Sequence, residues 1–194
     1  TAIFATNTWG LSISKLSEGF DAELKSRFCG VHFFNPPRYM HLCELIPLST
    51  TRQDILDNLE TFLTTTLGKG IITAKDTPNF VANRVGVAGM LATMAEAAKY
   101  GIPFDIVDQL TGSKLGRAKS ATFRTADVVG LDTMGHVIAT MQNTLPNDPF
   151  APSYATPAVL KTLVEKGALG QKTKGGFFKK EGKQIMVFDS NSSS

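Results

Sequence analysis

Two apolar segments, residues 28–34 and 40–48, carry the side chains best suited to acid–base chemistry. A turn-rich stretch with two successive prolines separates them, so we expect two strands that fold back on each other. If the connection is centred near Arg38, His32 lies opposite Glu44. Directly opposed side chains point to the same face with Cβ atoms about 4.5–5.5 Å apart, which lets a carboxylate hold an imidazole.

This pairing predicts that His32 acts as a general acid and base. A carboxylate bonded to one ring nitrogen fixes the tautomer and stabilises the imidazolium, so the other nitrogen can exchange a proton near neutral pH. The residues alone leave two alternatives open, a structural ion pair between His32 and Glu44 or a histidine bonded to the backbone. In proteins generally these structural arrangements are the more common ones.

Strand and helix patterns alternate up to about Lys75 and supply the elements that position this pair. We expect strands at residues 2–5, 28–34, 40–48 and 71–74, and helices at 12–20 and from 51 onward. Thr51 is the expected N-cap of the second helix, with Asp54 at the third position, and Gly68 lies just past the helix end. The alternation is typical of an α/β sheet, but the strands are too few for a whole doubly wound domain.

After Asp76 the pattern changes to helices almost throughout, so the expected fold class is α/β followed by all-α. This change predicts two domains, residues 1–75 and residues 76–194. The expected helices cover residues 80–100, 103–110, 122–129, 131–145 and 156–167. A hairpin over residues 176–188 should turn about Glu181 and Gly182.

The helix over residues 80–100 carries apolar residues on more than one stripe between Val85 and Ala98. Only a narrow polar side is left, which is typical of a helix that is buried on several faces. In a domain this small we expect the additional face to form a subunit interface, and therefore a homodimer.

Composition excludes several other classes of protein. Of 194 residues 42% are hydrophobic, which suffices for a sizeable core. The excess of 20 Lys and Arg over 17 Asp and Glu is not gathered into a basic patch, which argues against a nucleic-acid partner. Cys29 and Cys43 lack the CxxC spacing of a metal site and favour reduced thiols in the cytoplasm. No apolar stretch reaches the roughly 18 residues that a membrane span needs.

Several motifs together resemble the 3-hydroxyacyl-CoA dehydrogenase family, in the expected order and over nearly the whole chain. They are Asn7-Thr8, HFFNPPRYMHLCELI at 32–46, DTPNFVANR at 76–84, GLDT at 130–133 and GQKTKGGFF at 170–178. The resemblance implies oxidation of 3-hydroxyacyl-CoA to 3-oxoacyl-CoA with NAD in fatty-acid β-oxidation. It makes residues 1–75 the C-terminal part of a Rossmann-type NAD-binding domain and residues 76–194 a helical domain for substrate binding and dimerisation.

The chain contains no GxGxxG motif, the phosphate-binding loop of such NAD-binding domains. The resemblance therefore implies that this loop precedes Thr1 in a longer parent protein. On that basis we expect this stretch alone to be inactive.

The resemblance also assigns a role to each matching position. His32 takes the proton of the substrate's 3-hydroxyl group, and Glu44 orients its ring. The remaining positions contact the cofactor, namely Asn7, Asn35 and Lys172, or the acyl-CoA, namely Asn35 and Asn83.

The residue patterns offer simpler alternatives for three of these positions. Asn35 also suits a turn residue whose side chain bonds local backbone. Asn83 lies on the same helical stripe as Val87 and Leu91, so it also suits a buried structural network. Lys172, beside a loop, also suits a solvated side chain.

Two positions depart from the family pattern. Trp9 stands where a serine is usual, which replaces a small hydroxyl near the reacting centre with an indole, unless the indole only packs against the sheet. Asn79 stands where glycine is usual, and asparagine tolerates positive φ better than most residues. The departure at Trp9 keeps open a non-catalytic dimerisation module with a vestigial acyl-CoA site. A hydroxy-acid dehydrogenase of another family fits less well, since it lacks the HFFNP motif.

Overall fold

The computed structural model describes residues 2–8 and 10–188, so Trp9 lies outside the described residues. The chain forms two compact units, Thr1–Arg84 and Val85–Ser194. Each unit has its own hydrophobic core, and the two are described separately below.

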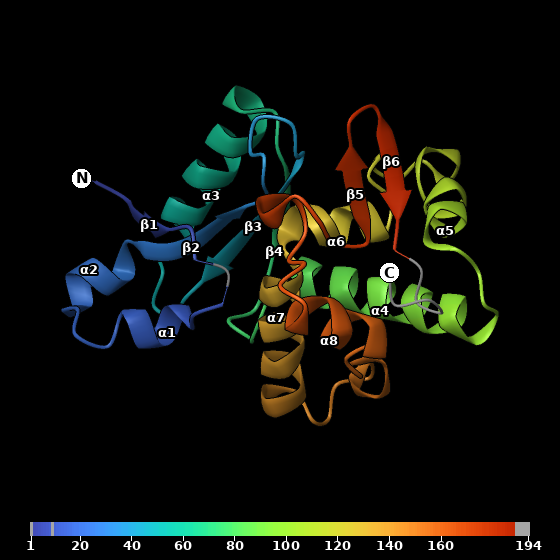
Figure 1. The fold of residues 1–194 in the computed structure, drawn as a ribbon. Helices are drawn as coiled ribbons and strands as arrows, with labels where there is room; N and C mark the ends of the chain where they lie inside the picture. The colour runs from blue at the N-terminus through green and yellow to red at the C-terminus, as the bar shows by residue number, and fades with distance from the viewer. Residues whose placement is uncertain (1, 9, 189–194) are drawn as a thin grey trace. The chain divides into compact units, whose positions relative to one another are not determined.

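The first unit is built on a four-stranded sheet in the order β1-β2-β3-β4 (Figure 1). The strands are β1 (Phe4–Thr6), β2 (Phe28–Phe33), β3 (Leu42–Pro47) and β4 (Gly70–Thr73). Strands β1 and β2 are parallel, β2 and β3 are antiparallel, and β3 and β4 are parallel. This mixed sheet, followed by a helical second unit, confirms the expected fold class.

Helices cover both faces of this sheet, with α3 on one side and α1 on the other (Figure 1). The helices are α1 (Ile13–Leu16), α2 (Ala22–Ser26) and α3 (Gln53–Thr61), which a π-helical turn (Phe62–Thr66) extends. Alternate residues of β2 serve the two cores because successive side chains of a strand point to opposite faces. Cys29 and Val31 pack in the cluster that includes Leu63, while Phe28 packs in the cluster of Ile13.

Cys29 and Cys43 are free thiols, and both are fully buried in this sheet. Burial raises the pKa of each thiol to about 11. Both side chains therefore act as small apolar core residues that stay protonated at neutral pH.

The expected cap of α3 was wrong by one residue. Arg52 occupies the N-cap position. The hydroxyl of Thr51 instead donates to the carbonyl oxygen of Phe28 at 2.7 Å and accepts from the N–H of Leu48 at 2.9 Å. Thr51 therefore ties the start of β2 to the residue that follows β3, which is a tertiary role that local sequence does not reveal.

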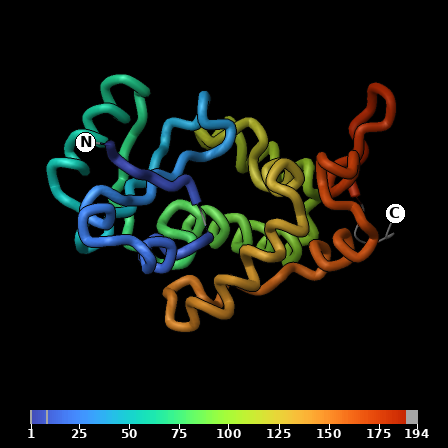
Figure 2. The backbone as a smooth tube through the Cα atoms, turned by 90° about the vertical axis from the view of Figure 1, so that its left-hand side faces the viewer, coloured from blue at the N-terminus to red at the C-terminus, as the bar shows by residue number. Residues whose placement is uncertain are grey.

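Helices dominate the second unit. The α-helices are α4 (Ala82–Lys99), which begins in the first unit, α5 (Phe104–Thr111), α6 (Phe123–Val129), α7 (Leu131–Thr144) and α8 (Ala158–Glu165). Short 3-10 turns lie at Ser113–Leu115, Ala151–Ser153 and Gln171–Thr173. Strands β5 (Phe178–Glu181) and β6 (Gln184–Val187) form the expected hairpin, which projects beyond the helices of its unit (Figure 2). Within residues 2–8 and 10–188, no helix is both long and apolar enough to cross a bilayer.

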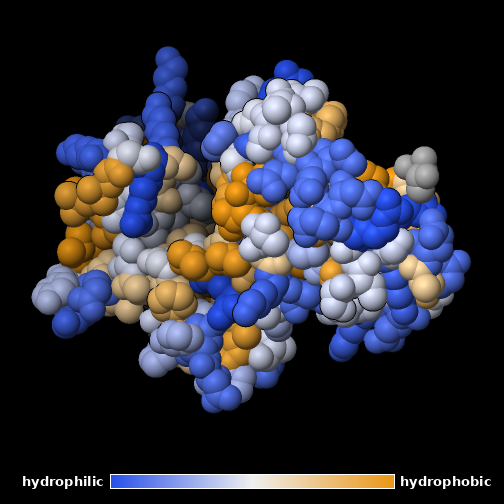
Figure 3. All heavy atoms as spheres, turned by 180° about the vertical axis from the view of Figure 1, so that it is seen from behind, coloured by the Kyte–Doolittle hydropathy of each residue, from blue (hydrophilic) through white to orange (hydrophobic). Residues whose placement is uncertain are grey.

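In a single chain, α4 buries only one stripe, which consists of Ala88, Leu91, Met94 and Ala97. The opposite face exposes Val85, Gly86, Gly89 and Ala92 to solvent. Apolar side chains also reach the surface elsewhere, as the orange patches in Figure 3 show. The exposed large apolar residues of the second unit include Ile106 and Leu110 on α5.

A buried carboxylate joins α6 to the segment that leads into the hairpin. Asp127 accepts hydrogen bonds from the N–H groups of Phe177 and Phe178, each at 2.9 Å. Burial raises the pKa of Asp127, although these two donors act in the opposite direction. Gly176 must be a glycine here, because a Cβ at this position would lie 2.1 Å from Oδ1 of Asp127.

Candidate active site

The antiparallel pairing of β2 and β3 sets His32 directly opposite Glu44, which confirms the register predicted from the spacing about Arg38. Nδ1 of His32 lies 2.7 Å from Oε2 of Glu44. Both residues are buried, with 5% of His32 and none of Glu44 exposed to solvent. A buried pair at this distance is a charge-assisted hydrogen bond with little competition from water.

The second oxygen of Glu44 is also bonded. Oε1 accepts from the N–H of Val81 at 2.9 Å and from the N–H of Ala82 at 2.8 Å, where α4 begins. Burial acts to raise the pKa of Glu44, but the hydrogen bond with His32 and the two backbone N–H groups together outweigh burial and lower it. Glu44 is therefore an ionised carboxylate at neutral pH.

This ionised partner defines the tautomer of His32. A carboxylate only accepts hydrogen bonds, so Nδ1 carries the proton in the neutral ring and Nε2 keeps a free lone pair. The rings of Phe34 and Phe80 lie close to the imidazole, with ring centroids 4.5 Å and 5.8 Å from that of His32. The geometry leaves Nε2 as a proton acceptor in an aromatic setting.

A left-handed turn precedes α4 and directs the N–H groups of Val81 and Ala82 to Glu44. Asn79 has φ of 60° and Phe80 has φ of 50°, so Asn79 adopts the kind of backbone conformation that asparagine tolerates better than most residues. Positive φ is strained for an aromatic residue, and the side chain of Phe80 is only 1% exposed. Packing of this ring in the core therefore holds the turn that presents Val81 and Ala82 to Glu44.

The other predicted positions of the first unit lie on neighbouring segments. Asn7 directly follows β1, and its Oδ1 accepts from the N–H of Phe33 at 2.9 Å. Asn35 is exposed in the turn after β2. Asn83 is half-buried in the first turn of α4, directly after Ala82. Asn7 and His32 thus lie toward the carboxyl ends of two parallel strands, where open α/β sheets bind ligands.

Lys172 belongs to the second unit and is ion-paired there. Its Nζ donates to both carboxylate oxygens of Asp132 at 2.6 Å. This hydrogen bond is the main reason that the pKa of Asp132 is lowered. Asp132 lies within the GLDT motif, but its ion pair with Lys172 was not predicted. The two residues are 40 positions apart, and no local sequence pattern connects them.

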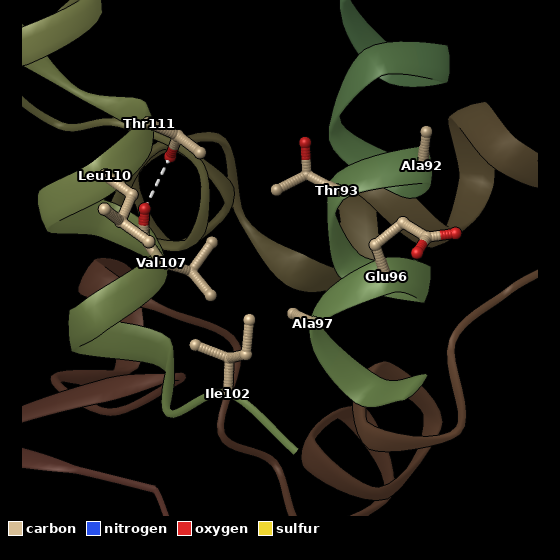
Figure 4. Close-up of a pocket in the computed structure, with 8 residues that line it drawn as sticks. All are labelled: Ala92, Thr93, Glu96, Ala97, Ile102, Val107, Leu110 and Thr111. Atoms are coloured by element: carbon tan, nitrogen blue, oxygen red, sulfur yellow. Dashed lines mark hydrogen bonds between the residues drawn. The ribbon is translucent and has the colours of Figure 1, made fainter. Parts of the chain in front are cut away.

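The second unit contains a pocket of about 370 Å³ between α4 and α5 (Figure 4). The residues that line it are Ala92, Thr93, Glu96, Ala97, Ile102, Val107, Leu110 and Thr111. Glu96 is the one titratable side chain among them. This pocket lacks a paired acid and base, so it is a weaker candidate for an active site than His32 and Glu44.

Comparison with known proteins supplies the family. Residues 1–77 match the family model of the 3-hydroxyacyl-CoA dehydrogenase NAD-binding domain, and residues 80–180 match that of the C-terminal domain. A Bacillus subtilis protein named "Probable 3-hydroxyacyl-CoA dehydrogenase" is 46% identical over 188 residues, which are 97% of this chain and 24% of that protein. A Deinococcus radiodurans protein of the same name is 44% identical over 180 residues, which are 93% of this chain and 51% of that protein.

A solved structure gives the same result. The crystal structure of (S)-3-hydroxybutyryl-CoA dehydrogenase PaaH1 from Ralstonia eutropha is 30% identical, with a TM-score of 0.74 over 90% of this chain and 59% of that one. The chain thus spans between a quarter and about three fifths of the length of these relatives. Motifs, fold and family models agree, and the chain belongs to the 3-hydroxyacyl-CoA dehydrogenase family.

Proposed function

We propose that the protein oxidises 3-hydroxyacyl-CoA to 3-oxoacyl-CoA in fatty-acid β-oxidation, with NAD as the hydride acceptor. The observation that carries this proposal is the buried 2.7 Å contact between His32 and Glu44. The residues present fit the cofactor, because Asn7 and His32 lie toward the carboxyl ends of parallel strands. NAD, when bound, supplies the acceptor for the hydride that leaves the substrate's C3 carbon.

In this reaction His32 moves the proton. Its Nε2 takes the proton of the 3-hydroxyl group as C3 is oxidised, and in the reverse direction the imidazolium returns a proton to the 3-oxo group. Glu44 holds the ring through Nδ1 and stabilises the imidazolium by its negative charge. The chain therefore supplies a base whose orientation and tautomer are set before substrate binds.

The remaining assignments are part of the same proposal. Asn35 and Asn83 bind the acyl-CoA, and Asn7, Asn35 and Lys172 bind the cofactor. We assign residues 1–75 to the C-terminal part of the NAD-binding domain and residues 76–194 to the helical domain for substrate binding and dimerisation. The protein acts in the cytoplasm, which agrees with its two buried, unpaired thiols.

Replacement of His32 tests the activity. In the protein as its gene encodes it, His32→Gln should lower the turnover of acetoacetyl-CoA, followed by NADH absorbance, by about 10²- to 10⁴-fold, the usual contribution of an acid–base group. The matched control is His136→Gln, an exposed histidine on α7, which should leave turnover unchanged. Near wild-type turnover in His32→Gln contradicts the mechanism.

We also propose that two copies of the chain associate through α4. Its solvent-exposed face carries Val85, Gly86, Gly89 and Ala92, and no charged residue lies between Val85 and Glu96. An apolar face of small residues lets a second helix approach closely, and a second copy of the same face is self-complementary under two-fold symmetry. The same face would serve a non-catalytic dimerisation module, but the buried dyad favours the enzyme.

A further inference from the structure

Glu44 makes three hydrogen bonds, and only one of them is needed to orient His32. Oε2 alone holds the ring of His32. Oε1 accepts from two main-chain N–H groups, those of Val81 and Ala82, which lie 37 and 38 residues later in the chain. The carboxylate therefore joins strand β3 to the first turn of α4 as well as to β2.

This second contact bonds main-chain N–H groups at the start of α4 from outside the helix. The first N–H groups of a helix have no partner within the helix and are usually bonded by a Ser, Thr, Asp or Asn side chain at the N-cap. Phe80 and Val81 precede α4 and have no side-chain oxygen to accept these bonds. Glu44 supplies an acceptor from the sheet for the N–H of Ala82, the first residue of α4, and for that of Val81 just before it. Its negative charge is also favourable at the positive end of the helix dipole.

We propose that Glu44 is a positioning residue for the substrate-binding turn as well as for His32. Its carboxylate fixes the start of α4, where Asn83 follows Ala82. It thereby holds Asn83 in a fixed position relative to the ring of His32. This inference rests on the proposed function, in which Asn83 contacts the acyl-CoA. It follows that loss of the Oε1 contacts weakens acyl-CoA binding even when His32 has already been replaced.

A His32→Gln background separates the two roles of Glu44. In this background Glu44→Leu removes every acceptor for the N–H groups of Val81 and Ala82, whereas Glu44→Gln keeps one oxygen for them. We expect Glu44→Leu to weaken acetoacetyl-CoA binding, measured by calorimetry, about tenfold or more, since hydrogen bonds to a charged group are among the stronger ones. Glu44→Gln should retain most of the affinity. Equal affinity in the Leu and Gln variants overturns the proposal.

Amide hydrogen exchange gives a readout that does not depend on ligand. The amides of Val81 and Ala82 should exchange faster in the Glu44→Leu variant than in the Glu44→Gln variant, while the amides in the middle of α4 keep their protection. We call the two bonds from Val81 and Ala82 to Glu44 the clamp. Unchanged exchange at both amides would count against it. Retention of protection within α4 also shows that the variant still folds.

Ala82→Pro tests the clamp with His32 and Glu44 both intact. Proline lacks the N–H that Glu44 binds, and it is well tolerated at the first position of a helix. We expect KM for acetoacetyl-CoA to rise several-fold while kcat changes little. The control is Ala158→Pro at the first residue of α8, where no side chain caps the helix, and it should change neither constant.

The outcomes keep the two proposals distinct. Full turnover in His32→Gln contradicts the proposed function, whatever the results of the Glu44 variants. An inactive His32→Gln, combined with unchanged KM in Ala82→Pro, leaves the proposed function standing and sinks only the clamp.

Discussion

Glu44 is fully buried and still ionised because three donors surround its two oxygens. Without them, burial would favour the neutral acid. The balance of these effects lowers the pKa of Glu44 below its ordinary value of 4.5. Stability and protonation are therefore linked at this residue.

Acid should lower the folding stability of the chain by protonating Glu44. Since its pKa is lower in the folded than in the unfolded chain, its contribution is complete above pH 4.5 and is lost as the pH falls through the lowered folded-state pKa. Urea unfolding at a series of pH values should show this loss, and Glu44→Gln should make the acid slope shallower. Glu60→Gln, which changes an exposed residue on α3, should not.

The acid slope should not vanish entirely in Glu44→Gln. Burial acts to raise the pKa of Asp76 as well, but bonds from Ser12, Ile13 and Ser14 outweigh burial and lower it. An unchanged slope in Glu44→Gln would show that Glu44 is not the residue that titrates.

At the scale of elements, the sequence predicted those helices and strands whose residues repeat at regular spacing. The register of β2 and β3 followed from the turn between them, which places His32 and Glu44 at equal distances from Arg38. Helix α2 was not predicted, because it is only five residues long and has no buried residue, so it leaves no apolar period. The clamp at α4 was equally invisible, since its donors are backbone N–H groups of Val81 and Ala82, which any residue except proline provides.

The junction between α6 and the hairpin offers a test at the same scale. Gly176→Ala should destabilise the chain by about 1–3 kcal/mol, a typical cost of overpacking, because the new Cβ would displace Asp127 from its two N–H donors. Thermal unfolding measures this cost. Gly175→Ala is the matched control, because its nearest neighbour is Cγ of Lys179 at 4.0 Å. Equal stability of the two variants would contradict the packing argument.

At the scale of the whole molecule, association through α4 predicts a dimer in solution. Ala92→Glu places a charge on the exposed face that we assign to the partner, so sedimentation at tens of micromolar should change from dimer to monomer. Ala22→Glu, on an exposed alanine at the start of α2, should leave the dimer intact. A wild-type chain that sediments as a monomer would remove the basis for this interface.

Labelling of the two cysteines can follow the opening of the first unit alone. The chain has only two cysteines, and both lie within Thr1–Arg84. Because Cys29 and Cys43 are fully buried, a disulfide reagent such as Ellman's can reach them only when their sheet opens. The rate of thiol labelling thus reports the opening of the sheet that carries His32 and Glu44, with no contribution from thiols of the helical unit.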